Sequence, residues 1–228
     1  MELRNRKILI VSPHPDDEVI GCGGLIAKAL SNGAKVFVLY MAVGKCRQLV
    51  TGGTDEDTRI KEIKSVAAAG GFGYKIQFVG DEFMRLDSLP QKTLIDAFED
   101  IISEQKPDIV CLPCHYSFDQ DHRAVFNAGM TAVRPIPQKV RHLVPVVLEY
   151  EEPYSWTVEA VFKPNFFIPL SKDELDKKIK LLKLHATQMR EQPHSRSVEN
   201  IRRLAGIRGA DIGVDAAEAY SLHRIVAK

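Results

Sequence analysis

Two runs of apolar, β-branched residues near the start of the chain predict strands that are buried on both faces. The first covers Lys7–Ser12 and the second covers residues 36–42 (VFVLYMA). Between them, residues 18–32 are predicted to form a helix, which Gly33 ends. Strand, helix and strand in this order make a β-α-β unit, so we expect a parallel sheet with helices on both faces.

The alternation of strand and helix holds through residue 112 and then loosens. Further strands are predicted at 75–79, 109–112 and 144–150, and further helices from about residue 57 into the segment 67–73, at 91–105 and at 123–134. Beyond residue 150 one more regular element is predicted, a basic amphipathic helix over 172–189. No shift in composition marks a second domain, so we predict a single α/β domain over 1–228.

The charge balance favours a small-molecule partner over a nucleic acid or a membrane. Lys and Arg (31) nearly balance Asp and Glu (30), and a net charge of +1 supplies no general field that would attract an anionic polymer or lipid surface. The N-terminal apolar run is too short for a signal peptide, and no run of about 18 apolar residues occurs elsewhere. The four cysteines show no disulfide framework. These features predict a soluble, cytoplasmic protein.

A polar cluster lies where the first strand passes into its helix, in the segment 12–18 (SPHPDDE). In open parallel sheets ligands bind beyond the carboxyl ends of the strands, so this segment is well placed for chemistry. His14 and Asp17, on a proline-stiffened turn, can converge on one cation while the Asp16 carboxylate faces the open coordination position. Capping the helix would need one acid, whereas three adjacent acids repel one another unless a cation lies among them. The metal interpretation is therefore favoured.

A second polar cluster, residues 115–123 (HYSFDQDHR), follows a later strand and would face the same edge of the sheet. A catalytic zinc site typically has three protein ligands and one open position. His122 supplies the third ligand, although such a histidine taken alone is more often a surface residue at a helix start. Asp121 could orient a ligand histidine as a supporting carboxylate. The lone CxxC of Cys111 and Cys114 is interpreted as two cysteines at the end of a buried strand.

The motifs PHPDDE and QDHRA, each after a strand, resemble those of the LmbE-like, PIG-L-like family of zinc-dependent N-deacetylases. The resemblance covers nearly the whole chain, because weaker matches follow at 59–62 (RIKE), 182–188 (LKLHATQ), 208–209 (RG) and 217–219 (AEA). It implies a Rossmann-like sheet and hydrolysis of an N-acetyl group, usually on a 2-acetamido sugar or a conjugate of one. Oligomers are common in the family, which leaves a homo-oligomer open.

Carried over to the matching positions, the resemblance implies zinc ligands at His14, Asp17 and His122 and a general base at Asp16. Zinc is the cofactor that it implies, and two histidines with one carboxylate also suit Fe(II). Arg59 matches a basic residue placed near the substrate in relatives. A surface position on its helix is an equally weighted alternative for Arg59.

One position departs from the family pattern HxDH, whose first histidine can protonate the leaving amine or stabilise the oxyanion. Here that position is Asp119. Either Asp119 takes the role of the acid, or the loop is arranged differently and His115, His185 or His194 enters the site. The candidate catalytic carboxylates are Asp16, Asp119 and Asp121.

Three other functions stay open from the sequence. A protein that keeps the metal loop but has lost catalysis would bind a sugar conjugate without turnover, and an amidase on a thiol conjugate would differ only in its substrate. A nucleotide-cofactor protein is disfavoured, because the glycines of 21–24 (GCGG) follow the acidic turn and lack the GxGxxG spacing. A sugar could also stack on four aromatic residues that we interpret instead as core or subunit contacts: Tyr154, Trp156, Phe162 and Phe166.

Overall fold

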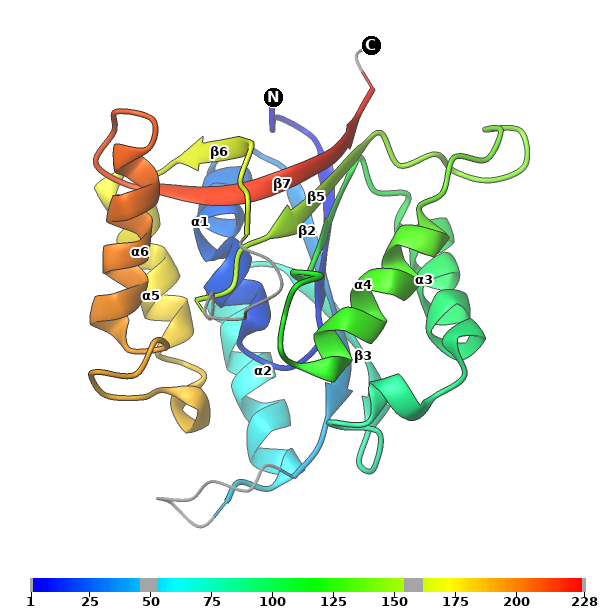
Figure 1. Ribbon diagram of the computed structural model, residues 1–228, viewed down its shortest axis with the longest axis horizontal. Coiled ribbons are helices and arrows are strands. Elements are labelled where there is room, and N and C mark those ends of the chain that lie inside the picture. The colour runs from blue at the N-terminus through cyan, green and yellow to red at the C-terminus, as the bar shows by residue number, and fades with distance from the viewer. Residues whose placement is uncertain (1, 46–52, 154–161, 227–228) are drawn as a thin grey trace.

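The computed structural model describes residues 2–45, 53–153 and 162–226, which form one sheet with helices on both faces (Figure 1). The strands in these ranges are β1 Lys7–Ser12, β2 Lys35–Val43, β3 Gly73–Val79, β4 Ile109–Leu112, β5 Val146–Tyr150, β6 Phe166–Pro169 and β7 Ala217–Ile225. The helices are α1 Asp17–Ser31, α2 Glu56–Gly70, α3 Gln91–Gln105, α4 Gln120–Ala132, α5 Lys172–Leu182 and α6 Val198–Ala210, with 3-10 turns at Leu86–Ser88 and Ala186–Gln188. The α/β class predicted from the sequence is confirmed.

The order of the strands creates a switch point beside β1. Across the sheet the order is β3-β2-β1-β4-β5-β7-β6, with β1 to β5 parallel and β7 antiparallel to both of its neighbours. The chain builds outward from β1 through β2 and β3, then returns to add β4 and β5 on the other side of β1. The crevice outside the carboxyl ends of β1 and β4 is where a sheet of this kind binds its ligand.

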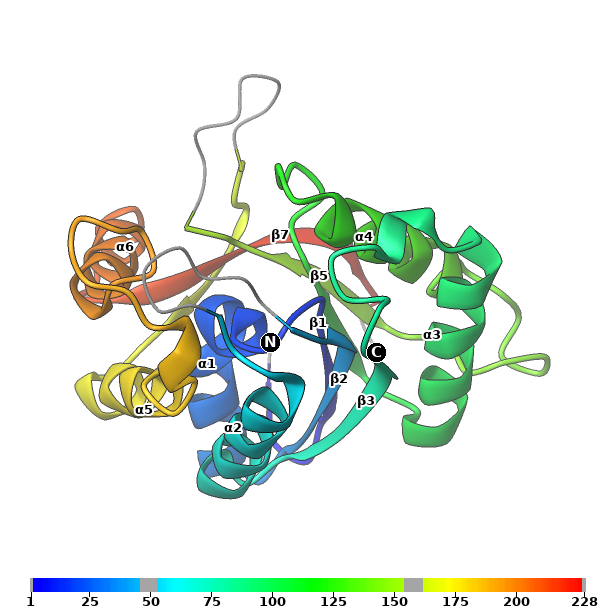
Figure 2. The same ribbon diagram turned by 90° about the horizontal axis from the view of Figure 1, so that it is seen from below.

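Side chains of β1 alternate between two hydrophobic cores, one on each face of the sheet. Ile8 and Ile10 belong to the core under α1, α2, α5 and α6, whereas Leu9 and Val11 belong to the core under α3 and α4. Figure 2 shows these two groups of helices on opposite sides of the sheet. Burial on both faces explains why the sequence of β1 is an unbroken apolar run.

The sequence-based expectations fail mainly after residue 150. The helix expected over 172–189 ends at Leu182, because His185 and Thr187 bond to Glu18 and Glu62 on other elements and the chain leaves the helical path. The expectation of a single regular element beyond residue 150 is also wrong, since β6, α6 and β7 lie there. Tertiary contacts, which no local pattern encodes, decide the structure of this part of the chain.

Side chains from α5 and β7 bridge the middle of α1. Glu218 of β7 accepts hydrogen bonds from the backbone amides of Gly24 and Leu25, at 2.7 Å each. Lys178 of α5 pairs with Glu218 at 2.6 Å and donates to the carbonyl of Ile20, also at 2.6 Å. The buried ion pair is therefore joined directly to the backbone of the helix.

The glycine-rich stretch of residues 21–24 lies inside α1 and not in a phosphate-binding turn. A Cβ atom at Gly21 would come within 2.2 Å of the Tyr150 ring, and one at Gly24 within 2.5 Å of Leu170. These glycines permit close packing of α1 against its neighbours. The nucleotide-cofactor interpretation loses the feature that suggested it.

Two further expectations concern membranes and cysteines. Within the described residues, no helix combines the length and the apolar character needed to cross a membrane. Cys22, Cys111 and Cys114 are buried and unbridged, while Cys46 lies outside the described residues. The CxxC pair thus lies at the buried end of β4.

Candidate metal centre

A cavity of about 250 Å³ opens at the carboxyl ends of β1 and β4. Its described wall is formed by the start of α1 and the turn before it, by α2, by the segments after β3, β4 and β5, and by the start of α4. The 3-10 turn Ala186–Gln188 and the turn that precedes α6 complete it. The charged and amide side chains on this wall are His14, Asp16, Asp17, Arg59, Asp119, His122, Glu152, Gln188 and Arg196. The two polar clusters of the sequence meet around this one space.

Three side chains present donor atoms to a common point in the cavity. One donor atom each from His14, Asp17 and His122 lies within 4.8 Å of the others. Asp17 Oδ2 is 3.2 Å from His122 Nε2 and 3.8 Å from His14 Nδ1. The far nitrogens are backed by carboxylates, since His14 Nε2 is 2.9 Å from Asp121 Oδ2 and His122 Nδ1 bonds to Glu152. Such partners fix the ring orientation and raise ligand basicity, so this donor set fits a divalent cation.

The pKa values of Asp17 and His122 are shifted because the two side chains are buried close to other charged groups. Burial alone would raise the pKa of Asp17, but the charges of His122 and His14 outweigh it and lower that pKa far below its ordinary value. Burial alone would lower the pKa of His122, but Asp17 and Glu152 raise it well above its ordinary value. The cluster therefore holds positive charge among its donors, a role that a bound cation would fill.

Two aspartates lie at the start of α4 beside His122. Asp121 is fully buried, and its Oδ1 accepts from the Leu86 amide at 2.9 Å while its Oδ2 faces His14. Asp121 thus holds His14 and contributes nothing to the cavity wall as described. Asp119 does line the cavity, and it caps α4 by accepting from the Asp121 amide at 2.8 Å.

Asp16 lines the cavity from a strained backbone. Its φ of 110° and ψ of −28° lie where residues other than glycine are rare, at a cost of about 1–3 kcal/mol. Its side chain makes no capping bond to α1, and Oδ2 instead pairs with Arg196 Nη1 at 2.9 Å. Burial raises the pKa of Asp16, and the neighbouring Asp17 adds to this against the lowering effect of Arg196. The adjacent carboxylates of Asp16 and Asp17 thus take different partners.

The three alternative histidines do not reach the described wall of the cavity. His115 Nδ1 lies 2.6 Å from Glu149, and His185 Nε2 lies 2.7 Å from Glu18. His194 lies in the turn before α6 and is not part of that wall. Of the residues considered for the acid, Asp119 is the one that the structure brings to the site.

Arg59 is 1% exposed and so is not a helix-surface residue. It reaches from α2 into the cavity wall, where it donates to the Gly44 carbonyl at 3.2 Å and lies over the Phe83 ring at 4.4 Å. Of the four aromatic residues considered earlier, Phe162 is buried and Phe166 packs beside the core, while Tyr154 and Trp156 lie outside the described residues.

Three charged or amide residues of the wall were not singled out from the sequence. Glu152 follows β5 in the run EYEEP, and a carboxylate after a strand end was a usable signal. Gln188 belongs to the motif LKLHATQ, to which no role was given. Arg196 lies in an irregular turn 180 residues after its partner Asp16, and no local signal marks it.

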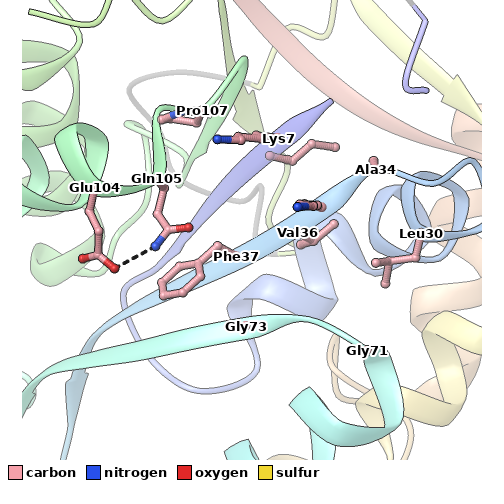
Figure 3. Close-up of a pocket in the computed structure, with 12 residues that line it drawn as sticks. Lys7, Leu30, Ala34, Val36, Phe37, Gly71, Gly73, Glu104, Gln105 and Pro107 are labelled. Atoms are coloured by element: carbon pink, nitrogen blue, oxygen red, sulfur yellow. Dashed lines mark hydrogen bonds between the residues drawn. The ribbon is translucent and has the colours of Figure 1, made fainter. Parts of the chain in front are cut away.

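A second cavity, of about 450 Å³, lies at the opposite edge of the sheet (Figure 3). Backbone and side chains at the amino ends of β1, β2 and β3 form its wall together with the ends of α1, α2 and α3. Its polar side chains do not converge: the one bond drawn joins Glu104 and Gln105, at 2.9 Å, on a single helix. Chemical character, not volume, distinguishes the cavity at the carboxyl edge.

Residues 9–133, more than half of the chain, match the family described as GlcNAc-PI de-N-acetylase, PIG-L. The uncharacterized deacetylase YaiS of Escherichia coli is 29% identical over 188 residues, covering 80% of this chain and 91% of the relative. The diacetylchitobiose deacetylase of Thermococcus kodakarensis is 26% identical over 200 residues, covering 82% of this chain and 71% of the relative.

The fold also occurs in a protein with a different activity. The structure of GalB, the 4-carboxy-2-hydroxymuconate hydratase of Pseudomonas putida KT2440, superposes with a TM-score of 0.76 at 20% identity, over 98% of each chain. At this identity the likeness shows the fold alone, so activity must be argued from the site.

Proposed function

The chain belongs to the PIG-L family, as its motifs predicted, and on that basis we propose that it is a metal-dependent N-deacetylase. The proposed substrate is a 2-acetamido sugar or a sugar conjugate, and the proposed cofactor is zinc, with Fe(II) suited to the same donors. The whole chain would form one deacetylase domain.

One arrangement carries the proposal: two histidines and Asp17 converge, and a second carboxylate, that of Asp16, lies beside them in the same cavity. A structural metal site needs no such additional carboxylate. The ion would be held by His14, Asp17 and His122. When bound, it would supply Lewis-acid polarisation of the acyl carbonyl and acidify water.

The other steps, proton transfer and the orientation of the two imidazoles, are assigned to side chains of the protein. Asp16 accepts a proton from the attacking water, whose oxygen joins the acyl carbon. The carbon–nitrogen bond breaks as the amine takes up a proton, delivered by Asp16 or by Asp119, and the products are acetate and a free amine. Asp121 and Glu152 keep the two imidazoles oriented.

The rest of the wall suits a ring that carries hydroxyl groups. Arg59, Gln188 and Arg196 supply donors, and Phe83 and Tyr150 supply apolar surface. Small-molecule sites commonly combine an apolar wall with a few polar groups that fix orientation. The Thermococcus relative is a diacetylchitobiose deacetylase by name, which supports the same substrate class.

The test measures metal content and amine release from N-acetylglucosamine and a panel of its conjugates, in the wild-type chain and in Asp16→Asn. Asn tolerates a positive φ, so the turn should keep its shape. We expect about one metal per chain in both proteins and a loss of turnover of about 10²-fold or more in the variant.

Each of the other possible outcomes would indicate a different function or mechanism. Binding of a conjugate without amine release would indicate a catalytically silent binder. Addition of water to a carbon–carbon double bond without amine release would indicate a hydratase. Metal-free protein with undiminished amine release would refute the proposed mechanism.

A further inference from the structure

A buried carboxylate lies directly behind the turn that carries Asp16. Glu18 is 0% exposed, and its Oε2 accepts a hydrogen bond from the backbone amide of Asp16 at 3.0 Å. The hydroxyl of Ser12 lies 3.1 Å from the same oxygen, and the Ser12 Oγ accepts from the Glu18 amide at 3.2 Å. Glu18 therefore ties the first turn of α1 to the end of β1.

The other oxygen of Glu18 is held from two distant elements. Tyr40 of β2 donates its hydroxyl to Oε1 at 2.9 Å, and Nε2 of His185, which follows α5, lies 2.7 Å from the same atom. Both supporting side chains are 0% exposed. Donors from separate parts of the fold thus fix both oxygens of Glu18.

The side chain of His185 uses only one of its two ring nitrogens in the described structure. Its Nδ1 is buried and has no hydrogen-bond partner among the described residues. A buried polar atom without a partner is destabilising, and native proteins retain few of them. The one side-chain hydrogen bond that His185 makes in the described structure is to Glu18, so supporting Glu18 is the role that the geometry gives it.

The Asp16 backbone needs such support. At a φ of 110° the residue lies outside the ordinary regions, and a conformation of this kind persists only where its surroundings over-determine it. The Asp16 carbonyl accepts from the Ile20 amide at 2.9 Å in the first turn of α1. The Asp16 amide is the other fixed point, and Glu18 holds it.

We infer that Glu18, supported by Tyr40 and His185, is a positioning residue that fixes the backbone of Asp16 and so aims its carboxylate. The inference rests on the proposed function, in which Asp16 is the base. Glu18 does not line the described cavity and touches no reacting atom. Its effect should appear in kcat, because small displacements of a reacting group slow the chemical step more than they weaken substrate binding.

A matched pair of substitutions tests the inference. Tyr40 and Tyr220 are both 0% exposed, and each donates its hydroxyl to a buried glutamate: Tyr40 to Glu18 at 2.9 Å, and Tyr220 to Glu218 at 2.8 Å. Tyr40→Phe and Tyr220→Phe remove the same group from similar surroundings. Only Tyr40→Phe weakens the support of Asp16.

The first readout is hydrogen exchange of the Asp16 backbone amide, followed by NMR on the full chain. We expect exchange about 10-fold faster in Tyr40→Phe than in the wild type, and unchanged in Tyr220→Phe, since the opening affects one turn of the chain. This measurement involves no substrate, so it can succeed or fail whether or not the protein is a deacetylase.

The second readout is steady-state kinetics with metal content. We expect kcat to fall about 10-fold in Tyr40→Phe with KM and metal content kept, and Tyr220→Phe to retain the wild-type kcat. His185→Gln, whose amide can place a donor near the position of Nε2, should retain more activity than His185→Asn, whose amide cannot reach Glu18.

Equal amide exchange and equal kcat in the two tyrosine variants would overturn the inference, even if the protein deacetylates sugars. Faster exchange without any deacetylase activity would keep the positioning role and discard the proposed function. Equal activity in His185→Gln and His185→Asn would show that His185 does not support Glu18.

Discussion

The two edges of the sheet carry cavities of different kinds, although the same strands reach both. The cavity at the amino edge is the larger, at about 450 Å³ against about 250 Å³. At the carboxyl edge, however, side chains from segments far apart in the sequence present donor atoms to one point. The difference shows that the convergence of polar groups, and not cavity volume, identifies the candidate site.

The difference has a structural cause. At the carboxyl edge, the segments after β1 and β5 and the start of α4 bring His14, Glu152 and His122 together, and each of the two histidines is held by a carboxylate of its own. At the amino edge, Lys7 and Lys35 are exposed and Glu104 bonds to its sequence neighbour. These side chains are therefore free to be solvated, and no contact given for them within the described residues directs them toward a common point.

The strongest test of the comparison removes a proposed metal ligand. We expect His14→Ala to lose the bound metal and to lower amine release by at least about 10³-fold, because both the Lewis acid and its geometry are lost. Gln105→Ala, in the wall of the cavity at the amino edge, should leave both unchanged. Metal analysis and amine release on purified proteins measure the effect, and equal losses in the two variants would abolish the distinction between the edges.

A smaller effect is expected from a carboxylate that backs a ligand. Glu152→Gln should weaken metal affinity about 10–100-fold, because the amide no longer orients His122 as an anion does. Glu104→Gln is the matched control, since it makes the same change at the amino edge. Competition with a chelator measures both affinities. Unchanged affinity in Glu152→Gln would mean that His122 is oriented by packing alone.

The smallest expected effect concerns a carboxylate that lies at the carboxyl edge but outside the cavity. Burial would raise the pKa of Glu149, but hydrogen bonds from His223 and His115 outweigh it and hold that pKa below its ordinary value. The stabilisation is therefore present above the unfolded pKa and is lost as the pH falls through the lower folded pKa.

Glu149→Gln should accordingly reduce the loss of Tm on acidification by about 2–4 °C, the equivalent of about 1 kcal/mol in a chain of this size. Thermal melts of both proteins between neutral pH and about pH 3.5 measure this difference. Metal affinity at neutral pH should stay at the wild-type value. A large loss of metal affinity in Glu149→Gln would mean that residues outside the cavity also contribute to metal binding.

The elements that sequence analysis predicted are those whose signal is local. The strand Ile109–Leu112 and the helix Gln91–Gln105 have the predicted bounds, because two-sided burial and helical periodicity are visible in short windows. β7 (AEAYSLHRI) was missed, since its buried Glu218 interrupts any strand pattern and is explained only by contact with α1.

The same contrast applies to the site. His14, Asp17 and His122, which short motifs identified, meet in one place. Arg196 was missed, because its partner lies 180 residues away and an ion pair over such a separation leaves no local spacing, whereas Glu152 carried the usable signal of a carboxylate after a strand end. Whether these residues perform the proposed roles is a matter for the variants described above.

The bridge between Glu218 and α1 has a consequence for the order in which the chain can mature on the ribosome. Glu218 accepts hydrogen bonds from two backbone amides that belong to residues made 194 and 193 positions earlier. A domain generally folds as a unit, and the middle of this helix lacks its carboxylate partner until residue 218 has been made. A nascent chain arrested before residue 218 would therefore leave the Gly24 and Leu25 amides of α1 without the Glu218 carboxylate.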